Sequence, residues 1–179
     1  MSLTNTTQKF GVITRLLHWS IFGIFVLQFF LVYRREYFPE DAPEKLQYIL
    51  LHKSLGVVVL VLALFMIFWR HLGKRPAFVA NMSRFEKKLA GSVHVLLYIL
   101  MLAMPLTGIA MSMYSGYGVS VFGQFNLPML VQKNKEIASI FYEMHVWISY
   151  AVIGIVGLHI LGALIHHFIR KDETLKRMI

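Results

Sequence analysis

The stretch that decides the fold is residues 144–169, MHVWISYAVIGIVGLHILGALIHHFI, which contains no Asp, Glu, Lys or Arg. A helix that crosses a bilayer needs about 20 mostly apolar residues. The other long segments without these charged residues are 16–33, 54–69 and 89–132. We therefore expect an all-α integral membrane four-helix bundle, a single domain over residues 1–179. Its expected spans are about 14–33, 50–69, 89–113 and 141–168.

Composition agrees with a membrane protein. Hydrophobic residues make up 57% of the chain, against roughly 45–50% in soluble domains. The segment 89–132 is too long for one span, and several glycines and Pro128 interrupt its second half. We expect a helix to about residue 113 and then a long, fairly apolar loop to about residue 140. The absence of cysteine excludes disulfides, iron–sulfur clusters, thiolate metal sites and haem attached through C-x-x-C-H.

Charge predicts the orientation. A net charge of +9 would suggest nucleic acid as the partner of a soluble protein, but basic flanks next to anionic lipid explain it better here. With four spans, twelve of the Lys and Arg residues lie on the side of the two termini and six lie opposite. Because basic residues favour the cytoplasmic side, both termini are expected to be cytoplasmic. The polar start of the chain indicates that the first span is retained rather than cleaved.

Four of the histidines inside the expected spans lie at two matched depths: His18, His52, His145 and His159. Fourteen residues separate His145 from His159, so both lie within about 40° on one helix face, roughly 21 Å apart along the axis. His52 has the depth of His145, and His18 has the depth of His159. Imidazoles are axial ligands of haem iron, and bundle cores commonly hold cofactors. The pattern predicts two b-type haems, one between His18 and His159 and one between His52 and His145.

Two alternatives compete with haem. Each histidine could be a polar packing residue that bonds a neighbouring helix, although four histidines at two matched depths favour a shared role. Zinc or copper is the other cofactor, but zinc sites gather three or four ligands at one point. Gly56, Gly157 and Gly162 could admit a flat macrocycle beside the histidines, or could simply allow close helix packing.

Further basic and imidazole side chains gather toward the cytoplasmic side. They could bind a quinone head group and relay protons to it, or contact lipid phosphates. These residues are His94, His166, His167, Arg70, His71 and Arg75. On the outer side, Lys53 follows a predicted ligand. It could pair with a haem propionate, attract a small anion, or be an ordinary interfacial lysine. The long loop from Met113 to Lys135 could cap the outer haem or lie on the membrane surface.

The sequence resembles the bacterial cytochrome b561 family of small four-helix di-haem membrane cytochromes, along nearly its whole length. The resemblance rests on Arg15-Leu-Leu-His-Trp19, Leu51-His-Lys-Ser-Leu-Gly56, His94 with Leu97-Tyr98, Pro105-Leu-Thr-Gly108, Gly157-Leu-His159, Ala163-Leu-Ile-His-His167 and Lys171-Asp-Glu-Thr-Leu-Lys-Arg-Met178. It maps the family's haem ligands onto His18, His52, His145 and His159. It also implies a bacterial inner-membrane location, electron exchange with ubiquinone, and oxidation of superoxide as one activity of the family.

Two functions follow as hypotheses. The first is an oxidoreductase that passes single electrons from an outer donor, superoxide by resemblance, to the ubiquinone pool. The second is a cytochrome b subunit that serves a dehydrogenase or hydrogenase partner and has no substrate chemistry of its own. The short outer connection at 34–49 offers little docking surface, which favours the first. A histidine-lined metal transporter is a more distant alternative, because the charge-free segments hold no carboxylates and the histidines are paired rather than clustered.

Overall fold

The computed structural model describes residues 2–79 and 82–179. Its long elements are the helices α1 (Val12–Arg35), α2 (Pro43–Leu72), α3 (Arg84–Tyr114) and α4 (Lys135–Leu164), and α4 continues as a π-helix over Ile165–Ile169. All four helices are long and apolar enough to cross a membrane. The expected all-α class is confirmed. One small exception lies between α3 and α4, where the two-residue strands β1 (Ser120–Val121) and β2 (Phe125–Asn126) pair antiparallel.

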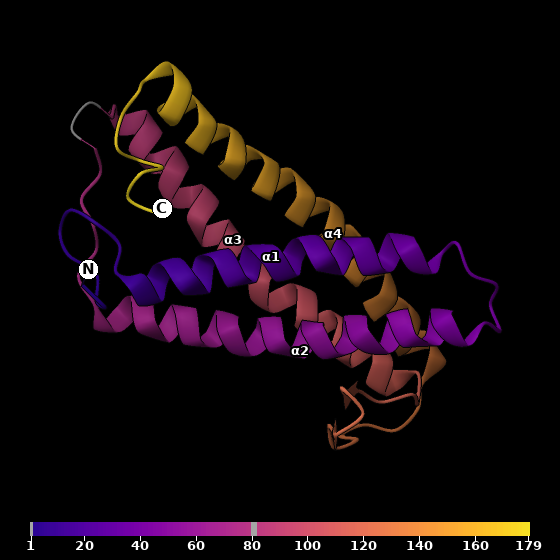
Figure 1. The fold of residues 1–179 in the computed structure, drawn as a ribbon. Coiled ribbons are helices and arrows are strands. Elements are labelled where there is room, and N and C mark those ends of the chain that lie inside the picture. Colours follow the sequence, from indigo (N-terminus) through magenta and orange to yellow (C-terminus); the bar gives the residue numbers. More distant parts are fainter. Residues whose placement is uncertain (1, 80–81) are drawn as a thin grey trace.

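The helices form two antiparallel hairpins that cross obliquely (Figure 1). Helix α1 packs on α2, α3 packs on α4, and α2 also contacts α3. The first described residues, from residue 2, and the C-terminal residues lie at the same end of the bundle as residues 73–79 of the connection between α2 and α3 (Figure 1). We call this the terminal end. The opposite end, which carries the connections 36–42 and 115–134, is the loop end.

The helices extend beyond the apolar segments that marked them in the sequence. Helix α2 begins at Pro43, where a proline fits because the first turn needs no backbone donor. Helix α4 begins at Lys135, and the Asn134 side chain accepts a hydrogen bond from the Ile137 amide at 3.1 Å. The expectation of a loop to about residue 140 was therefore wrong. The sequence-based bounds followed the segments without charged residues. They therefore missed the first turn of α4, which contains Lys135 and Glu136 and extends beyond the apolar segment.

The C-terminal residues fold back over the terminal end. The Trp19 indole donates to the Met178 carbonyl at 2.8 Å, and the Arg177 guanidinium donates to the Ala77 carbonyl at 2.5 Å. An ion pair between Arg170 and Glu86 joins the end of the π-helix to the start of α3. The tail thus contacts α1 and the 73–83 connection, and it closes one end of the bundle.

Candidate functional site

The histidines of the four helices meet in two pairs. His18 on α1 faces His159 on α4, with ring centroids 6.1 Å apart. His52 on α2 faces His145 on α4, with centroids 6.2 Å apart. These are the two pairs that depth in the sequence predicts, one toward each end of the bundle. Among the described residues no group of three or more His, Cys, Asp or Glu side chains is placed to hold a metal ion.

The second ring nitrogen of His145 has defined partners. Its Nδ1 lies 3.0 Å from the Met104 carbonyl and 3.2 Å from the Thr107 hydroxyl on α3. Ligand histidines usually donate their other N–H to a carbonyl, which fixes the tautomer and leaves the opposite nitrogen for the metal. Donation from Nδ1 to Met104 therefore leaves Nε2 of His145 free to bind a metal ion. The sequence indicated no role for Met104 or Thr107, although Thr107 lies in the stretch 105–108 that resembles the family, because their role depends on how α3 crosses α4.

Gly108 makes room for the His145 ring. A Cβ atom at this position would lie 3.0 Å from Cε1 of His145, closer than ordinary van der Waals contact. At Gly157 and Gly162, by contrast, an added Cβ would meet no described atom within 4 Å. Close helix packing was one of the two explanations for the glycines near His159. No helix packs closely against either glycine within the described part of the chain, so this explanation does not apply to them.

His94 lies against the pair at the terminal end. Its ring centroid is 5.1 Å from that of His159, and its Nδ1 is 2.6 Å from the Ala90 carbonyl. Nδ1 donates to this carbonyl of its own helix, so Nε2 is left for another partner. The sequence grouped His94 with a set of quinone-side residues, and the structure brings it next to His159.

His166 bonds to the tail. Its Nδ1 lies 2.5 Å from Oδ2 of Asp172, whose other oxygen accepts the Thr174 amide at 2.8 Å. Burial acts to raise the pKa of Asp172, but the hydrogen bonds from His166 and Thr174 outweigh it, and the net pKa is lowered. His167 packs on Phe168 with ring centroids 4.8 Å apart. Within the described part of the chain its buried Nδ1 has no hydrogen-bond partner.

The other candidates on this side are separate from one another. The Arg70 guanidinium donates to the Tyr98 hydroxyl at 3.1 Å and lies 5.0 Å from the centre of that ring. His71 bonds the Ile67 carbonyl of its own helix at 2.8 Å, and Arg75 is exposed on the connection 73–83. Among residues 2–79 and 82–179, no hydrogen bond or ion pair joins Arg70, His71 or Arg75 to His94 or His166.

Lys53 lies beneath the 115–134 connection at the loop end. Its Nζ donates to the Ser112 hydroxyl at 2.6 Å and to the Gly118 carbonyl at 3.3 Å. The ammonium group also lies 5.8 Å from the centre of the Tyr117 ring. Lys53 is thus a half-buried cation beside His52, bonded to neutral oxygens.

Comparison with known proteins identifies the family. The sequence profile described as "Prokaryotic cytochrome b561" matches residues 9–179. This chain belongs to that family. It is 32% identical to "Cytochrome b561 homolog 2" of Escherichia coli K12 over 185 residues, covering 100% of this chain and 95% of that protein. "Cytochrome b561 homolog 1" of the same organism is 33% identical, with coverages of 91% and 92%. The "Probable superoxide oxidase CybB" of Yersinia pestis is 27% identical, and 96% of each chain is covered.

Membership in the prokaryotic cytochrome b561 family implies haem b, and the residues present fit that group. Metal–imidazole bonds of about 2.0 Å on both sides of one ion set the ring centroids about 6 Å apart. The separations of 6.1 and 6.2 Å meet this condition at both ends of the bundle. Nδ1 of His18 and of His52 are buried without a hydrogen-bond partner among the described residues. Each end of the cytochrome therefore offers a pair of imidazole nitrogens of the kind that bind haem iron.

Gln28 is a further polar residue that the sequence reasoning missed. Its amide donates to the His52 carbonyl at 3.1 Å, while its own Oε1 is buried and unpartnered within the described part of the cytochrome. Polar side chains at membrane depth are costly and usually functional. A lone glutamine in the apolar run 16–33 is the signal that could have found it.

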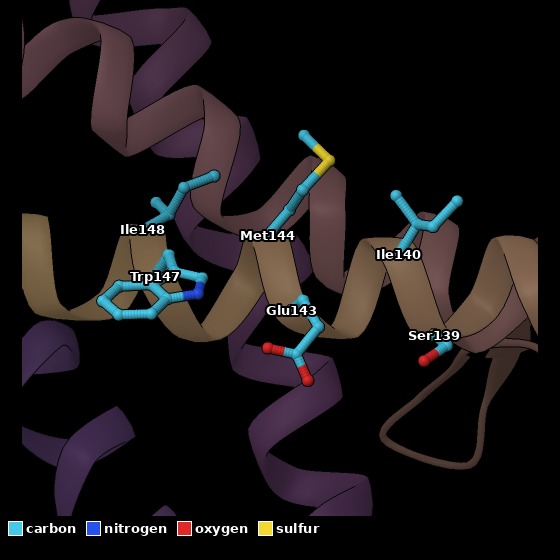
Figure 2. A pocket seen from close by; sticks show the side chains of 6 residues that line it. All are labelled: Ser139, Ile140, Glu143, Met144, Trp147 and Ile148. Carbon is cyan, nitrogen blue, oxygen red and sulfur yellow. The ribbon is translucent and has the colours of Figure 1, made fainter.

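The protein also has a surface hollow of about 470 Å³, which none of the histidines or their bonded neighbours line. It is lined by side chains of α4 alone, among them Ile140, Glu143 and Trp147 (Figure 2). Trp147 and Ile140 are largely exposed. The hollow lies on the side of α4 away from the histidine pairs, so it has no part in the candidate haem sites.

Proposed function

We propose that this membrane cytochrome binds two haem b groups and transfers single electrons across the bilayer between superoxide and ubiquinone. His18 and His159 would hold one haem at the terminal end, and His52 and His145 would hold the other at the loop end. The observation that carries the proposal is the equal spacing of the two imidazole pairs, 6.1 and 6.2 Å between centroids. Bound haem would supply an iron that gains and loses one electron reversibly.

The protein's own residues prepare the two sites. Met104 and Thr107 orient His145 through its Nδ1, and Gly108 leaves room for its ring. Both imidazole pairs lie among apolar helices that exclude water. The excess of basic residues at the terminal end supports a cytoplasmic position for that end, which makes the loop end the outer side.

The outer donor is proposed to be superoxide, supported by the name of the Yersinia pestis relative, a probable superoxide oxidase. In a balanced reaction each superoxide loses one electron and becomes oxygen. Ubiquinone takes two such electrons and two protons and becomes ubiquinol. Lys53 would raise the local positive potential beside His52 and so attract the anion. Its bonds to Ser112 and Gly118 are made with neutral oxygens, so its charge is not cancelled.

Ubiquinone is proposed to bind at the terminal end. His94 contacts His159 there, and its Nε2 could accept a proton from a quinol or, once protonated, donate to a quinone oxygen. His166, with its Nδ1 bonded to Asp172, could relay a proton. His167, Arg70 and Arg75 are further candidates on this side, where contact with lipid phosphates is the alternative role.

The experiment has two stages. A pyridine haemochrome assay on the detergent-purified protein should give about two haem b per chain, and no haem would overturn the proposal. Superoxide generated by xanthine oxidase should then drive ubiquinol formation by the protein alone, with no added partner. Two haems without this activity would favour the alternative, a cytochrome b subunit that serves a dehydrogenase or hydrogenase.

A further inference from the structure

Residues 115–132, which we call the loop-end hairpin, form an uncharged and apolar surface. They contain no Asp, Glu, Lys or Arg. Several large side chains are exposed: Tyr117 at 85%, Leu130 at 75%, Phe125 at 59% and Phe122 at 52%. The other connection at this end, 36–42, carries three acidic residues. The connection 36–42 thus has the composition of a water-exposed segment, and the loop-end hairpin does not.

The hairpin docks on the side of α2 rather than beyond its end. The Ser54 hydroxyl accepts the Phe122 amide at 2.8 Å, and Lys53 bonds the Gly118 carbonyl at 3.3 Å. Ser54 lies eleven residues (54 − 43) inside α2, so the attachment is about 16 Å along the axis from the start of that helix. Figure 1 shows the hairpin beside α2, away from the tip formed by the α1–α2 connection.

This depth coincides with the edge of the apolar region. The uncharged run of α2 begins at Ser54 itself. The uncharged run of α3 begins at residue 89, passes through the hairpin and ends before Lys133. The exposed face of the hairpin therefore continues the lipid-facing surface of the bundle at the level where the bilayer begins.

Phe122 has a backbone conformation that supports the same conclusion. Its φ is +50°, a left-handed conformation that is unusual and strained for a bulky residue. The bond from its amide to the buried Ser54 hydroxyl holds it there. The neighbouring Gly123 has φ +71° without strain, whereas the aromatic Phe122 keeps its strained conformation with its side chain 52% exposed.

We infer that the loop-end hairpin is an interfacial membrane anchor, whose exposed aromatic and aliphatic side chains enter the lipid head-group and acyl boundary. Aromatic side chains concentrate at this boundary, and exposed apolar patches mark membrane or protein contact. The lack of charge and the continuity with the spans favour lipid. Anchored in this way, the hairpin fixes Gly118 over Lys53 and closes the bundle on the side of His52.

The absence of cysteine makes the test direct. Single Cys variants Tyr117→Cys, Phe125→Cys and Leu130→Cys carry a nitroxide label in nanodiscs of phosphatidylethanolamine and phosphatidylglycerol, one chain per disc. Collision rates with oxygen and with a water-soluble nickel chelate report the depth of each label. Asp41→Cys in the charged connection is the aqueous control. Leu161→Cys, at an exposed position of α4, is the lipid control.

Labels on the hairpin should resemble Leu161→Cys, with nickel collision rates several-fold below those at Asp41→Cys and high oxygen collision rates. Nickel accessibility equal to that at Asp41→Cys would overturn the inference. Low accessibility to both reagents in these single-chain discs would also overturn it, because the labels would then be buried within the protein. Spin–spin broadening when two chains share a disc would overturn it as well, because a second copy would then cover the surface. The three positions give independent readings, so one variant that fails to insert still leaves the other two decisive.

Discussion

The imidazole of His94 lies 5.1 Å from that of His159, nearer than the 6.1 Å between His159 and its partner His18. Three imidazoles therefore meet at the terminal end, although one haem iron takes at most two axial protein ligands. His94 bonds the Ala90 carbonyl of its own helix through Nδ1, which leaves its Nε2 open, as it does for His145. The distances discriminate between the candidates: 6.1 Å matches the spacing of about 6 Å that two imidazoles on one metal ion need, whereas 5.1 Å is too short. This supports His18, from α1, as the second ligand.

The ligand assignment predicts that His159→Ala removes the terminal-end haem and spares the other, so that haem falls from about two to about one per chain. His94→Ala should keep both, because its ring is too close to that of His159 for the two to share one metal ion. The pyridine haemochrome assay measures both variants. Loss of both haems in His159→Ala, or of one in His94→Ala, would contradict the pairing.

Gly108→Ala should weaken haem binding at the loop end. The added Cβ would lie 3.0 Å from Cε1 of His145 and displace the ring from its bond to Met104. Overpacking of this kind costs about 1–3 kcal/mol, and disturbing the support of a ligand typically lowers metal affinity about 10–100-fold. Haem titration of the apoprotein, followed by optical spectra, measures the change.

The matched control is Gly91→Ala on the same helix, where an added Cβ meets no described atom within 4 Å. It should bind haem as the unchanged protein does. Equal haem affinity in Gly108→Ala and Gly91→Ala would mean that the close approach of Gly108 has no influence on His145.

The sequence predicts what helix geometry alone determines. The fourteen-residue interval between His145 and His159 fixes their shared face and their depth, and those depths matched His52 and His18 to the neighbours that they have in the structure. The sequence does not determine contacts across helices. The support of His145 by Thr107 and Gly108 depends on the crossing of α3 and α4, which hydrophobic periodicity does not set.

Loops were harder to predict for the same reason. Glycines and Pro128 identify a break in the apolar run, but the docking of Phe122 on Ser54 joins residues that are far apart in the chain. The tail is similar. The bond from His166, inside the π-helix, to Asp172 requires the chain to turn back once that helix has ended, and the sequence does not show this turn. Short polar residues inside apolar runs, Gln28 and Ser54 among them, were the available signals.

Lys53→Met should slow superoxide oxidation at low ionic strength by about tenfold, because a cation beside a substrate entrance raises the association rate of an anion by that order or more. Added salt should narrow the difference, since screening removes the advantage that the charge gives. Initial rates with a steady superoxide source, measured over a range of salt concentrations, test this. Haem content should remain at about two.

Ser112→Ala separates charge from structure. It removes the 2.6 Å bond from Lys53 to the Ser112 hydroxyl but keeps the ammonium group. It should therefore retain most of the rate and its salt dependence. If Ser112→Ala lowers the rate as much as Lys53→Met does, the role of Lys53 is to hold the hairpin in place rather than to attract an anion.

Asp172→Asn should loosen the tail at neutral pH, because it removes the carboxylate that accepts bonds from His166 and from the Thr174 amide. Amide hydrogen exchange across residues 173–178, corrected for its intrinsic pH dependence, should become several-fold faster, since local opening controls such exchange. Glu173→Gln is the control: it removes the charge of the neighbouring exposed carboxylate, which pairs with Lys176, and should leave His166 attached to Asp172.

The pH dependence of this effect has a definite sign. The pKa of Asp172 is lowered from its ordinary value of 3.8 in the folded protein, so the carboxylate binds its proton more weakly there than in the unfolded chain. The contribution of Asp172 to stability is therefore complete above 3.8 and is lost as the pH falls through the lower folded-state pKa. The unchanged protein and Asp172→Asn should differ in tail exchange down to about pH 4 and converge only below it. Convergence already near neutral pH would show that the carboxylate does not hold the tail.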